Sequence, residues 1–124
     1  MEEKKGFDIY DRAFKFAVRT AKTIDQLPLT QTTREYSKQL IRASGSVGSN
    51  LEEADGALTR KDFINKIGIS RREARESRYW LKLLEATTNF TDKTIGNEIR
   101  WLINESKEIM LILSSIIKNT KDSD

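Results

Sequence analysis

Apolar residues recur at steps of three and four positions along almost the whole chain, and this spacing constrains the fold more than any other feature. Residues spaced in this way lie on one face of an α-helix. Three stretches interrupt the pattern and favour turns: Pro28 with its neighbours, residues 56–59 and residues 89–92. The sequence therefore predicts four amphipathic helices, over about residues 8–26, 32–57, 60–88 and 92–119.

The connections between these segments are short, which makes consecutive helices antiparallel neighbours. A chain of 124 residues has the length of one ordinary domain with one hydrophobic core. We therefore expect an all-α fold, an antiparallel up-and-down four-helix bundle, in which residues 1–124 form a single domain. In the second segment, Thr32 and Glu35 have the spacing of a capping box, and Gly45 and Gly48 are expected to mark close approach between helices.

The chain contains neither cysteine nor histidine. This composition excludes disulfides, thiolate and imidazole metal sites, and nucleophiles that a histidine activates. Glu52, Glu53 and Asp55 are close in sequence, but without visible partners on a second helix they are better explained as solvated side chains than as a metal site. We expect no catalytic residue, no metal, no cofactor and no enzymatic activity.

The sequence does not have the features of a membrane or secreted protein. The longest nearly apolar run, residues 109–117, includes Ser114 and Ser115 and is far shorter than the ~20 residues that span a bilayer. The amino terminus is charged and lacks the apolar segment of a secretory signal. We expect a soluble cytoplasmic protein that does not interact with membranes.

The third and fourth segments carry more apolar surface than the interior of a bundle requires. At 100° per residue, several large side chains fall opposite the expected core face: Ile69, Trp80, Leu83, Trp101 and Ile112. Monomers seldom expose large apolar patches, and tryptophan is enriched in interfaces. We predict self-association through these residues, with both tryptophans as anchors. The alternative is that the tryptophans pack inside a wider core or lie singly on the surface.

A basic stripe follows the third segment at steps of four and three residues: Arg71, Arg75, Arg78 and Lys82. Arginine offers a fork of donors that matches phosphate oxygens, so these side chains are candidates for binding RNA or DNA. The net charge of +3 permits such a partner without requiring it. Alternatively, the stripe is solvated or pairs with acids, as Arg72 and Glu76 could do at i,i+4. No platform of interleaved aromatic residues indicates sequence-specific reading of bases.

A polar line on the second segment adjoins its glycines: Arg42, Ser46, Asn50 and Glu53. Such a line could bind a ligand, but polar side chains beside glycines more often join helices or subunits by hydrogen bonds. These four residues also match the central motif of a known family, an arginine followed by small residues and then Asn-x-x-Glu.

Together with the runs 61–67 and 72–81, this motif resembles the 23S rRNA intervening-sequence protein family, also called the four-helix-bundle protein family. The likeness extends from Tyr10 to Lys118. Many relatives have glycine after the motif glutamate, where this chain has Ala54. The resemblance implies a bundle that assembles into homo-pentameric rings. Some relatives are encoded inside ribosomal RNA genes, and a similar fold is the accessory protein of diversity-generating retroelements, where a basic ring contacts nucleic acid and reverse transcriptase.

Two functional hypotheses follow. The first is a ring-forming module without enzymatic activity that binds RNA or DNA non-specifically through phosphate contacts on the basic stripe. The second is an oligomeric scaffold that binds a protein partner, with the stripe used in pairing subunits.

Overall fold

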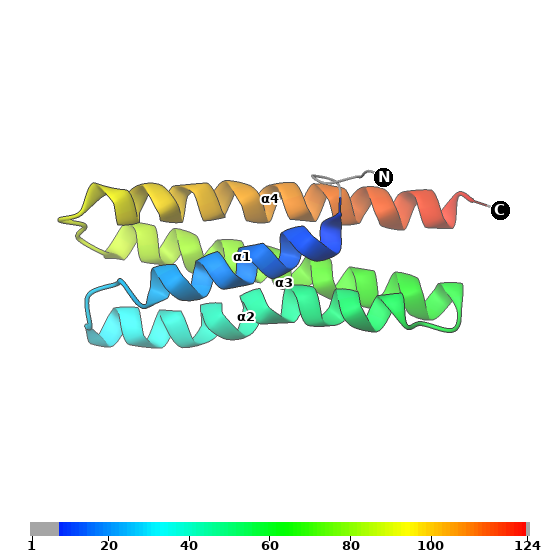
Figure 1. Cartoon of the computed structure of the whole chain (residues 1–124), viewed down its shortest axis with the longest axis horizontal. Coiled ribbons are helices and arrows are strands. Elements are labelled where there is room, and N and C mark those ends of the chain that lie inside the picture. The colour runs from blue at the N-terminus through cyan, green and yellow to red at the C-terminus, as the bar shows by residue number, and fades with distance from the viewer. Residues whose placement is uncertain (1–7, 124) are drawn as a thin grey trace.

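The computed structural model describes residues 8–123 and shows the expected all-α four-helix bundle (Figure 1). The helices are α1 (Ile9–Ile24), α2 (Gln31–Asp55), α3 (Arg60–Thr87) and α4 (Lys93–Lys121). The prediction of four helices separated by three turns is confirmed, with ends that differ by at most two residues. The charged amino-terminal residues that argue against a secretory signal lie outside the described range.

Each helix begins after a residue whose side chain accepts a hydrogen bond from the first turn: Asp8, Thr30, Thr59 and Asp92. Such caps satisfy amides that have no partner within the helix. The expected capping box of Thr32 and Glu35 is wrong. Thr30 and Thr33 form it instead, because Thr30 has the extended backbone of an N-cap and α2 starts one residue earlier than Thr32.

The four helices pack in a square, with α1 against α2, α2 against α3, α3 against α4, and α4 against α1. Within residues 8–123 no Cα atoms of the diagonal pairs lie within 8 Å of each other. The 16 residues of α1 span ~24 Å, whereas the 28 residues of α3 span ~42 Å. The end of the bundle where α3 begins and α4 ends therefore extends past α1 (Figure 1).

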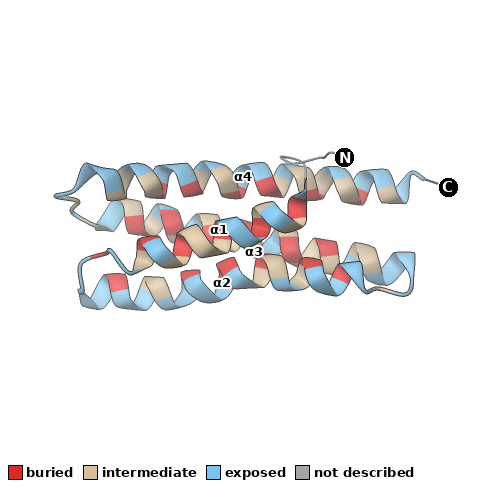
Figure 2. Ribbon diagram, viewed as in Figure 1, coloured by how far each residue is buried: buried red, intermediate tan, exposed pale blue. Residues whose placement is uncertain are grey.

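The apolar stripes of the four helices face one another and form the core (Figure 2). The largest fully buried side chains come from every helix: Phe16, Leu40, Leu51, Ile67, Leu81, Leu84, Ile99, Leu102, Ile109 and Leu113. Burial of such a side chain contributes about 1.5–3 kcal/mol, so the stripes supply the main driving force for folding. No helix among the described residues is long and apolar enough to cross a membrane.

Small residues in the core join α2 to its neighbours. The buried Ser70 hydroxyl on α3 donates to the Val47 carbonyl of α2 at 2.7 Å. A Cβ at Gly48 would lie 3.8 Å from the Ala13 Cβ, an ordinary contact, and a Cβ at Gly45 would meet nothing within 4 Å. Gly48 therefore lies against Ala13 of α1, as expected, whereas Gly45 is exposed and the expectation of close helix approach is wrong there.

Candidate functional site

The sides of α3 and α4 that face each other carry several cations. Four residues spaced at seven-residue intervals lie along one side of α4: Arg100, Lys107, Ser114 and Lys121. Arg71 donates to the Ser114 hydroxyl at 3.2 Å, and Arg100 donates to Glu85 at 3.1 Å. These two bonds show that this side of α4 faces α3. We call this surface the α3/α4 seam.

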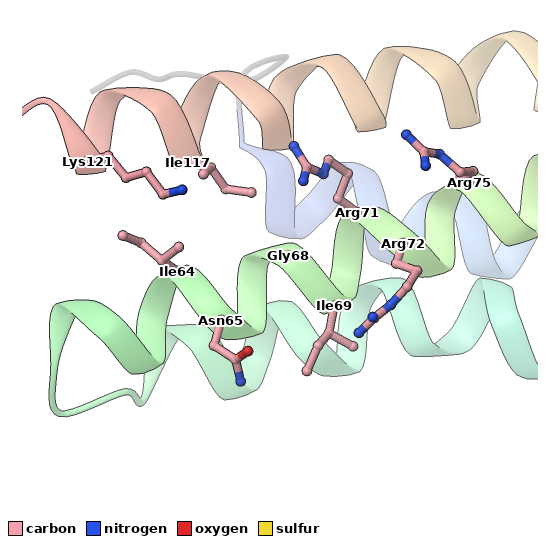
Figure 3. Close-up of a pocket in the computed structure, with 9 residues that line it drawn as sticks. All are labelled: Ile64, Asn65, Gly68, Ile69, Arg71, Arg72, Arg75, Ile117 and Lys121. Carbon is pink, nitrogen blue, oxygen red and sulfur yellow. The ribbon is translucent and has the colours of Figure 1, made fainter.

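A groove opens in the α3/α4 seam at the end of the bundle that extends past α1 (Figure 3). Its volume is about 410 Å³. Nine residues line it: Ile64, Asn65, Gly68, Ile69, Arg71, Arg72, Arg75, Ile117 and Lys121. Four of them are cations and none is a carboxylate. We call this the basic groove.

Gly68 creates the hollow of the basic groove because it has no side chain. The lining residues of α3 surround it at the helical steps i+1, i±3, i±4 and i+7, and a Cβ at Gly68 would meet nothing within 4 Å. Figure 3 shows Ile117 and Lys121 of α4 across from Ile64, while Arg72 extends on the other side of Gly68. An anion in the groove would therefore meet cations from both helices, beside apolar walls.

The other charged seams of the bundle are compensated. Between α1 and α4, Arg12 binds Glu105 through bonds of 2.9 and 2.6 Å, and Arg19 binds Glu98 through bonds of 2.8 and 2.7 Å. The bond that Arg19 donates lowers the pKa of Glu98, and the bond that Arg12 donates to Glu105 raises the pKa of Arg12. These are structural pairs, in which each charge is satisfied by the neighbouring helix.

The cations of the basic groove have no such partners. Across the described part of the chain, residues 8–123, none of Arg71, Arg72, Arg75 and Lys121 lies within 4 Å of a carboxylate. Like charges gathered in this way raise the local positive potential and attract anions from solution.

The structure divides the four residues of the predicted basic stripe. Arg71 and Arg75 line the basic groove, and Arg71 is half-buried by its bond to Ser114. Lys82 is exposed farther along α3. The Arg78 Nε is hidden from solvent and has no hydrogen-bond partner among the described residues, so only the end of its guanidinium could reach a ligand.

The expected pair between Arg72 and Glu76 is wrong. Glu76 accepts hydrogen bonds from Arg42 of α2 and, at 3.1 Å, from the Trp80 indole nitrogen. Arg42 also binds Glu73 at 3.3 Å, so one cation from α2 binds both acids of α3 that are close to Arg72 in sequence. Arg72 consequently remains exposed at the basic groove.

The described contacts of the polar line on α2 lie within the bundle. Arg42 joins α2 to α3, as described above. Asn50 donates to the Ser46 carbonyl of its own helix at 2.9 Å, and Glu53 is exposed. This geometry favours the structural interpretation of the line over ligand binding. Within residues 8–123 no group of three or more acidic, histidine or cysteine side chains could hold a metal ion.

The five predicted interface residues do not form one continuous face. Ile69, Leu83 and Ile112 are half-buried. Trp80 packs 5.7 Å from the Tyr36 ring at the seam of α2 and α3, whereas Trp101, 41% exposed, lies 3.5 Å beneath the Arg19 guanidinium at the seam of α1 and α4. These seams are on opposite sides of the bundle. Self-association through these residues stays a prediction.

Sequence reasoning did not single out Gly68, Arg72 or Lys121 as site residues. The available signal was a helical glycine with cations three, four and seven positions after it. Lys121 could not be found in this way, because its proximity to Gly68 depends on how α4 packs against α3.

The chain is similar to a protein of unknown function from the S23 ribosomal protein family of Bacteroides thetaiotaomicron VPI-5482, whose crystal structure is known at 1.70 Å resolution. The two share 39% sequence identity and a TM-score of 0.77, over 89% of this chain and 95% of the other. No match was found among curated proteins. Residues 5–115 match the model of the 23S rRNA-intervening sequence protein family. The family match and the similarity to the crystal structure agree. The chain belongs to the 23S rRNA-intervening sequence protein family.

Proposed function

We propose that this protein is a ring-forming helical module without enzymatic activity that binds RNA or DNA through phosphate contacts. The observation that carries this proposal is the basic groove, where four cations from two helices lie together and no carboxylate lines the wall. Arginine guanidinium groups can each donate two parallel hydrogen bonds to a phosphate, and Lys121 adds a point charge.

Contacts of this kind recognise the backbone and not the bases. They give affinity with little sequence specificity, because phosphates are the same at every nucleotide. Arg78 and Lys82 extend the positive surface along α3 beyond the groove. The description of the family refers to intervening sequences of 23S rRNA, which makes RNA a natural first ligand to test.

We also propose that copies of the chain assemble into a ring, a homo-pentamer as the family resemblance implies. In a closed ring each subunit uses two different faces, one toward each neighbour. Trp80 and Trp101 lie on opposite seams of the bundle, which suits such head-to-tail contacts. The mass of the purified protein in solution tests this assembly, and a monomer at tens of micromolar would exclude it.

The binding test compares affinity for a labelled RNA oligomer at two salt concentrations. If four phosphates of a single strand are contacted, affinity falls ~50-fold between about 50 and 200 mM salt, since each contact releases a counterion. A variant in which Arg71, Arg72, Arg75 and Lys121 become glutamine should bind more weakly and show a shallower salt dependence.

A matched control replaces four exposed cations of α1 and α2 with glutamine: Lys15, Lys22, Arg34 and Lys38. Both variants change the net charge from +3 to −1, that is +3 minus four, so a difference between them reports position and not total charge. Absence of binding at low salt, or equal loss in both variants, would refute the proposal. Stoichiometric co-purification of a protein without nucleic acid would then favour the scaffold hypothesis.

A further inference from the structure

An outward-facing row on α3 continues from the basic groove toward the other end of the helix. Its members are spaced at steps of four and three residues: Gly68, Arg72, Arg75, Tyr79 and Lys82. This spacing keeps them on one side of the helix over ~21 Å. Every member after Gly68 is exposed. We call this line the outer row.

Tyr79 is the aromatic member of the outer row, and its side chain is exposed. It is 58% exposed, between Arg75 one turn before it and Lys82 one turn after it. Its ring meets Trp80 edge-on, with centroids 5.5 Å apart and planes at 66°. Trp80 is in turn held by Tyr36 and by its bond to Glu76. The Tyr79 ring is therefore supported on one side and accessible to a ligand.

We propose that the outer row binds an unpaired nucleic-acid strand, with a base stacked on Tyr79 and phosphates on Arg72, Arg75 and Lys82. This inference rests on the proposed function and adds the class of ligand. An aromatic ring between cations suits a single strand, because every base presents a π-face and every nucleotide a phosphate. Isoleucines around Gly68 offer apolar contact to a sugar or base at the end of the row.

A duplex cannot use Tyr79 in this way, since its bases are stacked on one another and offer no free π-face along its length. The cations bind both forms, whereas stacking adds affinity for the unpaired strand alone. Stacking on one aromatic side chain is worth about 5- to 150-fold in affinity. The preference for a single strand over a duplex of the same sequence should fall in this range and should depend on Tyr79.

The test measures the affinity of the full chain for a mixed-sequence RNA oligomer and for its duplex at about 50 mM salt. Tyr79→Leu keeps an apolar side chain but removes the π-system, and should weaken single-strand binding by at least about fivefold without changing duplex binding. Tyr79→Phe should bind like the wild type. Phe14→Leu is the matched control, because Phe14 is 68% exposed on α1, and it should change neither affinity.

Two outcomes would overturn the inference. The first is unchanged single-strand affinity in Tyr79→Leu. The second is an equal loss for single strand and duplex, which would mean that Tyr79 acts by supporting the helix surface. In both cases the wild type still binds nucleic acid, so the proposed function survives. A wild type that binds neither form would refute the proposed function itself.

Discussion

Replacing Gly68 with alanine should stabilise the protein and at the same time disturb the basic groove. Glycine in the interior of a helix is less favourable than alanine by about 0.5–1 kcal/mol. A Cβ at this position would meet nothing within 4 Å, so no steric cost offsets this gain. Unfolding entropy of ~2.1 cal/mol/K per residue gives ~260 cal/mol/K for 124 residues, and the expected rise in Tm is therefore ~2–4 °C.

Thermal unfolding followed by circular dichroism measures this rise, at equal protein concentrations because assembly makes Tm depend on concentration. Gly45→Ala is the matched control, since Gly45 lies within α2 and also has nothing within 4 Å of a Cβ. Both variants should gain similar stability. A lower Tm for Gly68→Ala would refute the reasoning that the space above Gly68 is open.

The functional half of the prediction separates the two glycines. The methyl group of Gly68→Ala projects into the basic groove, and RNA affinity at low salt should fall, whereas Gly45→Ala should bind like the wild type. Equal affinity in all three proteins would show that the ligand does not occupy the hollow at Gly68, and that this glycine is not needed for binding.

Three further predictions concern the bundle itself. Ser70→Ala should lose about 1 kcal/mol in a urea titration because the Val47 carbonyl loses its 2.7 Å bond, and Ser44→Ala, whose 3.4 Å bond stays within its own helix, should lose less. Thr30→Ala removes the cap of α2 and should lower the free energy of unfolding by about 1 kcal/mol. Thr32→Ala changes an exposed position and should be nearly neutral. A larger loss in Thr32→Ala than in Thr30→Ala would mean that Thr32 is the cap. The bond from Arg19 lowers the pKa of Glu98 in the folded state below its value in the unfolded chain. The stabilisation that this bond gives is therefore present above the unfolded-state pKa of Glu98, and it is lost as the pH falls through the folded-state pKa. The wild type should therefore exceed Glu98→Gln by less than about 1 kcal/mol at neutral pH, and this difference should disappear in acid; a constant difference would contradict the pairing.

The helices could be predicted from the sequence because each amphipathic stripe is a property of its own segment. The turn at Pro28 and the caps at Thr59 and Asp92 are local too, and all three end or begin helices near the expected positions. The start of α2 was harder to predict. Thr32 and Glu35 satisfy the spacing of a capping box, but the competing pair of Thr30 and Thr33 has the same spacing, and its hydroxyls accept from the amides of Thr33 and Thr30.

The candidate site could be predicted only in part, because charge compensation depends on neighbouring helices. The spacing of Arg72 and Glu76 indicates a local pair, yet Arg42 approaches from α2 and binds both Glu73 and Glu76. A guanidinium that binds two carboxylates one turn apart is bound more strongly than an arginine that pairs with one carboxylate on its own helix. The same packing leaves Arg72 exposed and brings Trp80 against Glu76.

Net charge is a poor guide to the ligand of such a bundle, because pairing removes charge from some seams and not from others. The chain has 22 basic and 19 acidic residues, which almost cancel in the sum of +3. Glu98 and Glu105 are used by Arg19 and Arg12 between α1 and α4, and Glu73 and Glu76 by Arg42 between α2 and α3. These four acids are thereby drawn to two seams, and Glu85 of the α3/α4 seam binds Arg100 and not a cation of the basic groove. A small net charge is thus compatible with a strongly basic local surface. The salt dependence of binding should be set by the number of cations in the basic groove and not by the net charge of the chain.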